Sequence, residues 1–148
     1  MIRLLIYEDN EDLRDAITFL IRSTPDLDLV GAFAQCVDVS KHLDELQPDV
    51  ILMDIEMPGM NGLEATSILK EKKPTVQVIM LTVFEDEQNL FTALRQGATG
   101  YFLKGEPPLH LLEGIRIVHE GGSVLTPKLA RRVFNFFNHS KKVEDKFY

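Results

Sequence analysis

Residues 49–62 read Asp-Val-Ile-Leu-Met-Asp-Ile-Glu-Met-Pro-Gly-Met-Asn-Gly, and this stretch decides the fold. Its apolar run, residues 50–53, lacks helical periodicity and is typical of a strand buried on both faces of a sheet. The run ends at Asp54, a loop containing Pro and Gly follows, and Asn61 is placed to cap a helix that begins near Leu63. Taken alone, Asp54 is equally consistent with a polar strand terminator and with a side chain presented at the carboxyl edge of a sheet, where ligands bind in open α/β folds.

The rest of the chain alternates apolar runs with amphipathic stretches. Strands are predicted at residues 2–7, 27–33, 50–53, 76–83 and 100–103, and helices at about 10–23, 37–46, 63–72, 87–96 and 107–120. Parallel strands need crossover connections, and the predicted helices supply them. The sequence therefore predicts an α/β fold: a doubly wound, flavodoxin-like, five-stranded parallel sheet in the order 2-1-3-4-5, with helices on both faces.

Composition limits the function classes. The chain has 148 residues and a net charge of -7, which disfavours a nucleic-acid-binding surface because such a surface needs a basic excess. Its one cysteine, Cys36, permits no internal disulfide and fits a reducing compartment. The first apolar run is too short for a signal peptide, and no stretch is long enough to span a membrane. We therefore expect a soluble cytoplasmic protein without a membrane partner.

The predicted strand order brings the polar residues that end four strands to one edge of the sheet. They are Glu8, Asp9, Asp54, Thr82 and Lys104. Neighbouring strands lie about 5 Å apart, so the three carboxylates would repel one another unless a cation lies among them, and a few hard oxygen ligands suit Mg²⁺. A hydroxyl and an ammonium beside Asp54 are what an incoming phosphoryl group needs, and aspartate is an effective phosphoryl acceptor.

Each of these residues also has an ordinary structural explanation. Asp9 can cap the first helix, Thr82 favours strands, and Lys104 can be a solvated strand end. Their combination at the ends of neighbouring strands favours a phosphoryl-transfer site in which Asp54 is the acceptor.

With these residues in view, residues 1–122 resemble the receiver domain of two-component response regulators. The resemblance implies that Asp54 is the phosphorylation site and that a sensor histidine kinase is the phosphoryl donor. It also implies a role for each neighbour of Asp54. Mg²⁺ is held by Glu8, Asp9, Asp54 and the backbone carbonyl of Glu56; the phosphoryl group is contacted by Thr82 and Lys104; the switch consists of Thr82 and Tyr101.

Residues 97–105 and 121–127 further resemble the NarL/LuxR class of transcription-regulating response regulators. Regulators of that class continue through a linker helix into a helix-turn-helix domain. Residues 123–148 are therefore expected to be a linker helix and tail toward such a domain, which alone would bind DNA, and a homodimer through the receiver or the linker helix is a further expectation. Two positions depart from the common pattern: Glu8 stands where many receivers have Asp, and Gly105 where many have Pro.

The carboxyl-terminal segment carries an apolar stripe. Leu129, Val133, Phe136 and Phe137 lie at i, i+4, i+7 and i+8, which predicts a helix over about 127–138. So short a helix is marginal in water on its own. We therefore expect the stripe to pack against its own domain or against a neighbouring molecule.

Two other functions fit parts of the pattern. A phosphatase of the haloacid-dehalogenase type would use Asp54 and a carboxylate two residues later, where Glu56 stands, but no Thr-rich phosphate loop follows. A flavin-binding flavodoxin-like module would need a phosphate-cradling loop after the first strand, whereas the carboxylates in residues 8–12 would repel a phosphate. The favoured function is a phosphorylation-activated signalling switch and not an enzyme.

Overall fold

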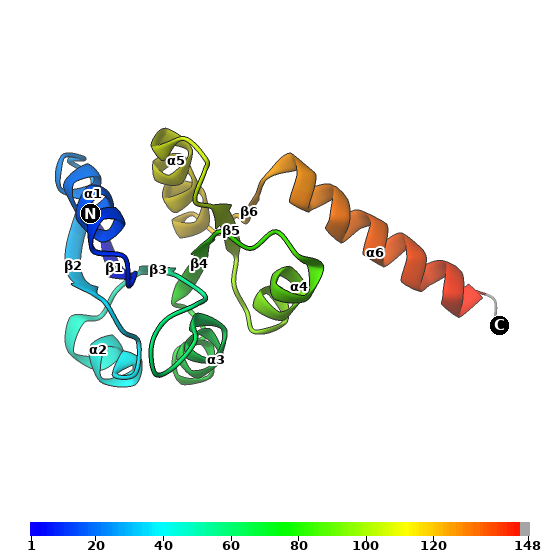
Figure 1. Cartoon of the computed structure of the whole chain (residues 1–148), viewed down its shortest axis with the longest axis horizontal. Helices are drawn as coiled ribbons and strands as arrows, with labels where there is room; N and C mark the ends of the chain where they lie inside the picture. The colour runs from blue at the N-terminus through cyan, green and yellow to red at the C-terminus, as the bar shows by residue number, and fades with distance from the viewer. Residues whose placement is uncertain (146–148) are drawn as a thin grey trace.

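The computed structural model describes the backbone of residues 1–145 and the side chains of residues 1–139. Within that range, strands and helices alternate along the chain (Figure 1). The strands are β1 (Ile2–Tyr7), β2 (Leu27–Phe33), β3 (Val50–Met53), β4 (Gln77–Thr82), β5 (Gly100–Leu103) and β6 (Val124–Leu125). The helices are α1 (Glu11–Arg22), α2 (Val39–Leu46), α3 (Gly62–Lys72), α4 (Glu87–Arg95), α5 (Pro108–His119) and α6 (Pro127–Asp145).

The strands described form one parallel sheet in the order β2-β1-β3-β4-β5-β6. The predicted fold class and the order of the first five strands are confirmed. The predicted number of five strands was wrong, because β6 adds a sixth strand beside β5. This strand has only two residues and follows a Gly-Gly pair, so its sequence has too little apolar pattern to be distinguished from a loop.

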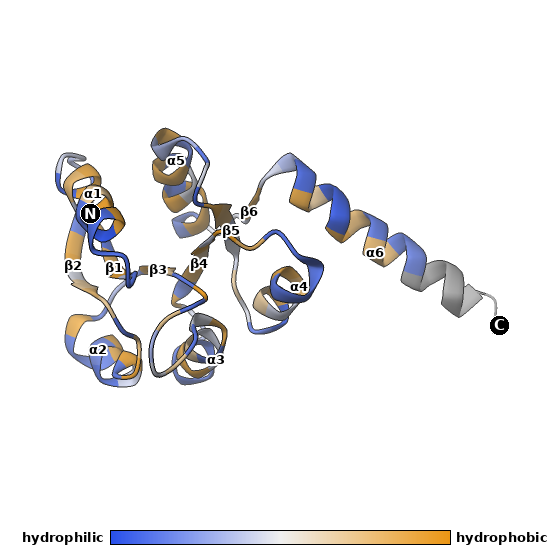
Figure 2. Cartoon of the chain, in the orientation of Figure 1, coloured by the Kyte–Doolittle hydropathy of each residue, from blue (hydrophilic) through white to orange (hydrophobic). Residues whose placement is uncertain are grey.

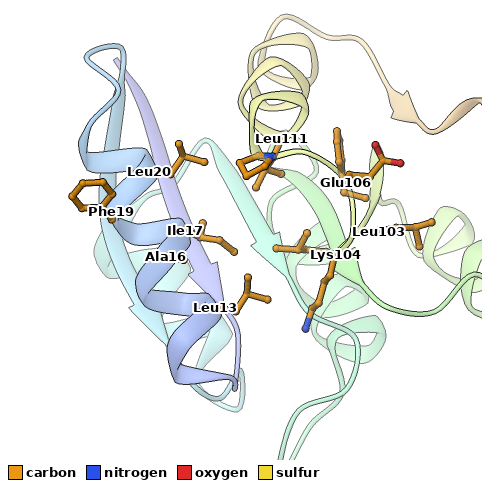
Figure 3. A pocket seen from close by; sticks show the side chains of 12 residues that line it. Leu13, Ala16, Ile17, Phe19, Leu20, Leu103, Lys104, Glu106 and Leu111 are labelled. Carbon is orange, nitrogen blue, oxygen red and sulfur yellow. The ribbon is translucent and has the colours of Figure 1, made fainter.

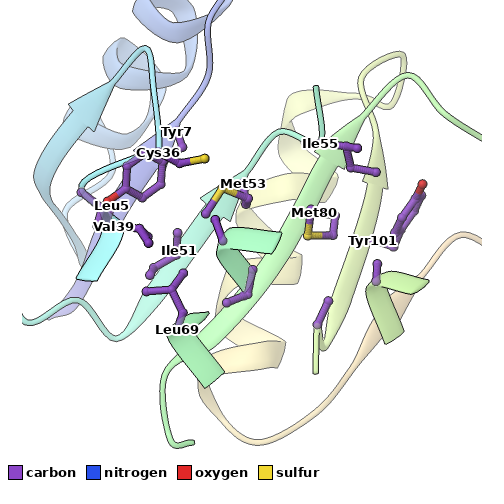
Figure 4. Close-up of a cluster of buried hydrophobic side chains, with 14 of the residues drawn as sticks. Leu5, Tyr7, Cys36, Val39, Ile51, Met53, Ile55, Leu69, Met80 and Tyr101 are labelled. Carbon is purple, nitrogen blue, oxygen red and sulfur yellow. The ribbon is translucent and has the colours of Figure 1, made fainter. Parts of the chain in front are cut away.

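Helices cover both faces of the sheet, with α1 and α5 on one face and α2, α3 and α4 on the other (Figure 1). Each face has its own apolar core. The core beneath α2–α4 includes Met53, Met80 and Tyr101 (Figure 4), and the core beneath α1 and α5 includes Leu52 and Phe102. β3 contributes to both cores and is buried throughout, as expected for an apolar run without alternation.

Helix α6 begins just after β6 and extends away from the sheet past α4 (Figure 1). Its first turn is capped by Thr126, whose hydroxyl accepts a hydrogen bond from the N–H of Leu129 at 3.2 Å. The helix is longer than the predicted 127–138. Its apolar residues lie in separate patches between hydrophilic ones (Figure 2), and none of the described helices has the length and apolar character that a membrane crossing requires.

The predicted apolar stripe of α6 packs against its own domain. Leu129 is fully buried in the core beneath α2–α4, and Val133 packs against that core. The Phe136 ring lies 4.5 Å from the ring of Phe91 in α4, measured between centroids. Phe137, by contrast, is 65% exposed. Three of the four stripe residues therefore contact the domain, whereas Phe137 lies mostly in solvent.

Candidate functional site

Asp54 directly follows β3, and its backbone is fixed by two neighbours. Its N–H donates to the carbonyl of Tyr7 at 3.0 Å, which ties the end of β3 to the end of β1. A Cβ added to Gly62 would lie 1.9 Å from the Asp54 carbonyl oxygen, so only glycine lets α3 begin this close to the strand end. Asn61 caps α3 as predicted, because its side chain accepts a hydrogen bond from the N–H of Glu64 at 2.9 Å.

Three carboxylates meet at this edge of the sheet. One oxygen each from Glu8, Asp9 and Asp54 lies within 4.8 Å of the others. Glu8 and Asp54 are buried, with 1% and 5% exposure, and Asp9 is exposed. The buried Oε1 of Glu8 accepts no hydrogen bond. Three converging carboxylates that offer hard oxygen ligands fit a divalent cation such as Mg²⁺.

Lys104 reaches the same cluster from the end of β5. Its Nζ lies 2.6 Å from Oε1 of Glu8 and 3.1 Å from Oδ2 of Asp54. The contact with Asp54 is a hydrogen bond, whereas the contact with Glu8 is an ion pair without hydrogen-bond geometry. One ammonium therefore faces two buried carboxylates, and the cluster carries an excess of negative charge.

This arrangement changes the pKa values of the cluster. Burial, followed by the hydrogen bond to Glu8 and the charge of Glu8, raises the pKa of Asp54 from 3.8 to about 7, although Lys104 opposes the change. Burial alone would lower the pKa of Lys104, but its close contacts with the carboxylates of Glu8 and Asp54 outweigh burial and raise that pKa. A cation among the carboxylates would favour the ionised form of Asp54.

Thr82 and Tyr101 are both buried, and both contact Phe84 in the loop between β4 and α4. The Thr82 hydroxyl oxygen accepts a hydrogen bond from the Phe84 N–H at 3.2 Å, and the Tyr101 hydroxyl donates to the Phe84 carbonyl at 2.8 Å. Burial raises the pKa of Tyr101 above its usual range, so this hydroxyl remains a donor at neutral pH. The expected switch residue Tyr101 is thus already turned inward in this structure.

Sequence reasoning missed three residues that hold the acidic cluster in place. The Arg14 guanidinium donates to the carbonyl of Glu8 at 2.8 Å. The Asn10 N–H donates to Oε2 of Glu8 at 3.1 Å, and the Asn10 side chain caps α1 by accepting a hydrogen bond from the Leu13 N–H. Gly62 is the third, through its contact with Asp54. Only Asn10 lies just beyond a strand end, whereas Arg14 lies within α1 and Gly62 begins α3, so these two had no comparable signal in the sequence. The carboxylate of Glu56 does not belong to the cluster of Glu8, Asp9 and Asp54, so only the backbone carbonyl of Glu56 is kept as a candidate ligand.

An apolar groove of about 250 Å³ opens beside Lys104, between α1 and α5 (Figure 3). Leu13, Ile17 and Leu20 project from α1 toward Leu111 of α5. Lys104 lines the groove and also places its ammonium in the acidic cluster. A molecule that occupies this groove would therefore lie next to the acidic cluster.

The family model for the response regulator receiver domain matches residues 4–116. The chain belongs to the response regulator receiver family. The receiver is 33% identical over 144 residues to the transcriptional regulatory protein LnrK of Bacillus subtilis (strain 168), and 34% identical over 136 residues to the oxygen regulatory protein NreC of Staphylococcus carnosus (strain TM300). These alignments cover 97% and 91% of this chain but 66% and 63% of the relatives, so the chain spans about two thirds of their length.

Solved structures give the same classification. A LuxR-family DNA-binding response regulator from Staphylococcus aureus is 32% identical, with a TM-score of 0.76, and the match covers 80% of this chain and 99% of that chain. A LuxR-family two-component response regulator from Aurantimonas sp. SI85-9A1 has a TM-score of 0.83 at 24% identity, over 90% of this chain and 95% of that chain, and shows the shared fold. The predicted membership in the NarL/LuxR class is confirmed.

Proposed function

We propose that this receiver is a phosphorylation-activated switch: Asp54 accepts a phosphoryl group from the phosphohistidine of a sensor histidine kinase and controls a transcription-regulating output domain. One arrangement carries the proposal. Asp54 is a buried carboxylate at a strand end, with Lys104 Nζ at 3.1 Å and oxygens of Glu8 and Asp9 within 4.8 Å. The likeness to LnrK and NreC, which are named as regulatory proteins, supports the output role.

The chain's own residues account for the transfer. A carboxylate oxygen of Asp54 bonds to phosphorus while the bond from phosphorus to the histidine nitrogen breaks, and the electron pair of that bond stays on the imidazole. Lys104 neutralises charge on the phosphoryl oxygens, and the Thr82 hydroxyl donates a hydrogen bond to one of them. The phosphoryl group then draws Thr82 toward itself and stabilises the inward position of Tyr101, which favours one form of the surface made by α4, β5 and α5.

Glu8, Asp9 and Asp54 would hold Mg²⁺, together with the backbone carbonyl of Glu56. When bound, the ion supplies positive charge that the cluster lacks and that favours the ionised, nucleophilic form of Asp54. The convergence of these three carboxylates, with oxygens within 4.8 Å of one another, supports this assignment.

The alternatives are less well supported. The haloacid-dehalogenase type of phosphatase is not favoured, because the receiver family model covers the residues around Asp54. We expect no turnover of a separate substrate, only the gain and loss of the receiver's own phosphoryl group. We further expect the receiver to act in the cytoplasm, residues 123–148 to lead toward a DNA-binding output domain, and DNA contact to occur through that domain alone.

Intact-mass measurement after incubation with acetyl phosphate tests the proposal. The wild type should gain the mass of one phosphoryl group with Mg²⁺ and none with a chelator, and Asp54→Asn should gain none. An Asp54→Asn protein that gains the same mass as the wild type would reject Asp54 as the acceptor.

A further inference from the structure

Helix α6 is attached to the receiver by one face. Leu129 is fully buried, and the ring of Phe136 lies 4.5 Å from that of Phe91 in α4. Away from this contact the helix is open to solvent, with Phe134 and Phe137 exposed by 68% and 65%. The first turns of α6 are therefore docked, and they lie beside the loop that joins β4 to α4.

That loop is bonded to the switch residues on its sheet side. Phe84 donates its N–H to the Thr82 hydroxyl and accepts a hydrogen bond from the Tyr101 hydroxyl at its carbonyl. Tyr101 has no exposed surface and belongs to the same core as Leu129 of α6. The position of Phe84 therefore depends directly on the inward position of Tyr101.

The next residue of the same loop, Glu85, is bonded to α6. The Glu85 carbonyl accepts a hydrogen bond from the Arg132 guanidinium, and the Glu85 carboxylate pairs with Lys128 Nζ at 3.4 Å. The Phe84 carbonyl belongs to the peptide unit directly before the Cα of Glu85, so only the torsions of Glu85 separate it from the two groups that Arg132 and Lys128 hold. A displacement of Phe84 is therefore transmitted to these groups over a single residue. The loop thus connects Thr82 and Tyr101 to α6 through consecutive residues.

We propose that the first half of α6 is a latch for the state in which Tyr101 is buried, so that docking of α6 and phosphorylation of Asp54 stabilise each other. The proposal rests on the proposed function, in which the phosphoryl group draws Thr82 toward Asp54. The structure has α6 docked while Tyr101 is buried and bonded to Phe84. Docking therefore belongs to the inward state, and linkage requires that whatever favours one of the two favours the other equally.

Hydrogen exchange on the whole chain, followed by mass spectrometry, tests the latch with a matched pair of variants. Arg132→Ala removes the donor to the Glu85 carbonyl. Arg131→Ala removes the same charge from the same helix, at an exposed residue to which no ion pair or hydrogen bond is assigned among the described side chains. Without phosphorylation, the amides of residues 83–86 and 129–137 should exchange about tenfold faster in Arg132→Ala, because a charge-assisted bond is lost, and within about twofold of wild type in Arg131→Ala.

Phosphorylation provides the reciprocal measurement. In wild type treated with acetyl phosphate and Mg²⁺, with phosphoryl gain verified by mass in the same sample, the same α6 amides should exchange about fivefold more slowly. At the same acetyl phosphate and Mg²⁺ concentrations, Arg132→Ala should reach a final ratio of phosphorylated to unphosphorylated protein about fivefold lower than Arg131→Ala, because linkage acts on the populations of the states. Equal exchange in the two variants, or unchanged or faster α6 exchange in the phosphorylated wild type, overturns the latch and leaves the proposed function intact.

Failure of the wild type to gain a phosphoryl group overturns the proposed function, and the latch is then decided by Tyr101→Phe. This change removes the hydrogen bond to the Phe84 carbonyl and keeps the ring. If the latch exists, the loss of this one neutral hydrogen bond loosens the loop, and the α6 amides of Tyr101→Phe should exchange about threefold faster than those of the wild type. Unchanged exchange rejects the latch.

Discussion

The edge of the sheet around Asp54 and the contact between α6 and α4 are held by opposite kinds of interaction. Around Asp54, buried carboxylates face a single ammonium, and Glu8 and Asp54 are only 1% and 5% exposed. The contact of α6 with α4 is an aromatic pair in which Phe136 remains 45% exposed, whereas the polar bonds of α6 go to Glu85 in the loop before α4. Desolvated charges respond strongly to pH, cations and single-atom changes, whereas half-exposed apolar contacts contribute little each. The acceptor site should therefore be intolerant of substitution, and the α6 contact tolerant.

Removal of Lys104 should have the largest effect on the acceptor site. Lys104→Ala is expected to lower the rate of phosphoryl uptake from acetyl phosphate by about 100-fold, because a preorganised positive charge at the transferring group is lost. Lys41→Ala is the control, since Lys41 is an exposed residue of α2 whose only assigned partner among the described side chains is Glu45 at 4.0 Å. Uptake by Lys104→Ala at the control rate would show that Lys104 is only a solvated strand end.

Gly62→Ala should destabilise the folded state through a clash with the backbone of Asp54. Its Cβ would lie 1.9 Å from the Asp54 carbonyl oxygen, and neither α3 nor the end of β3 can move without disturbing buried packing. We expect a loss of about 3 kcal/mol in the free energy of unfolding, measured by urea denaturation. Gly105→Ala is the matched control, because a Cβ there meets no atom within 4 Å. Equal stability of the two variants would mean that the approach of α3 to Asp54 is easily relaxed.

The raised pKa of Asp54 predicts a pH dependence of stability. Because this pKa is about 7 in the folded protein and 3.8 in its ordinary state, the folded state binds more protons between these values, and wild-type stability falls as the pH rises through them. Asn carries no charge at any pH. At pH 8, with a chelator present, the free energy of unfolding of Asp54→Asn should therefore exceed that of the wild type by about 2 kcal/mol, a figure that already allows for the lost pairing with Lys104. The gain should shrink as the pH falls toward 5.

Thermal melting between pH 5 and pH 8 measures this difference. Asp15→Asn, at an exposed carboxylate of α1, is the control and should differ from the wild type by the same small amount at every pH. Mg²⁺ should stabilise the wild type at pH 8 and reduce its deficit relative to Asp54→Asn, because a ligand that binds the folded state stabilises it. A melting difference that does not change with pH would contradict the raised pKa.

The contrast between the two regions also separates what the sequence could predict from what it could not. The residues around Asp54 were predictable because the carboxyl ends of parallel strands must meet at one edge. Their contacts were not, since the approach of Lys104 to Glu8 and of Gly62 to Asp54 depends on distances that no pattern encodes. For α6 the pattern predicted a stripe but left its partner open, and nothing in the sequence marked Phe91 of α4 as that partner.

Substitution of Phe136, in the contact between α6 and α4, should have the smallest effect on stability. Phe136→Ala is expected to lower the free energy of unfolding by about 1 kcal/mol, because one aromatic pair with Phe91 is lost at a half-exposed position. Phe134→Ala removes an equal ring from the same helix at a 68% exposed position and should leave the melting temperature unchanged. If Phe91 is the partner, Phe91→Ala/Phe136→Ala should lose less stability than the sum of the single changes, whereas full additivity would show that the two rings do not interact.

Sedimentation of the same proteins then tests the alternative partner: a mass that changes only with Phe136→Ala would mean that the stripe also binds a second copy, and an unchanged mass assigns the stripe to its own domain.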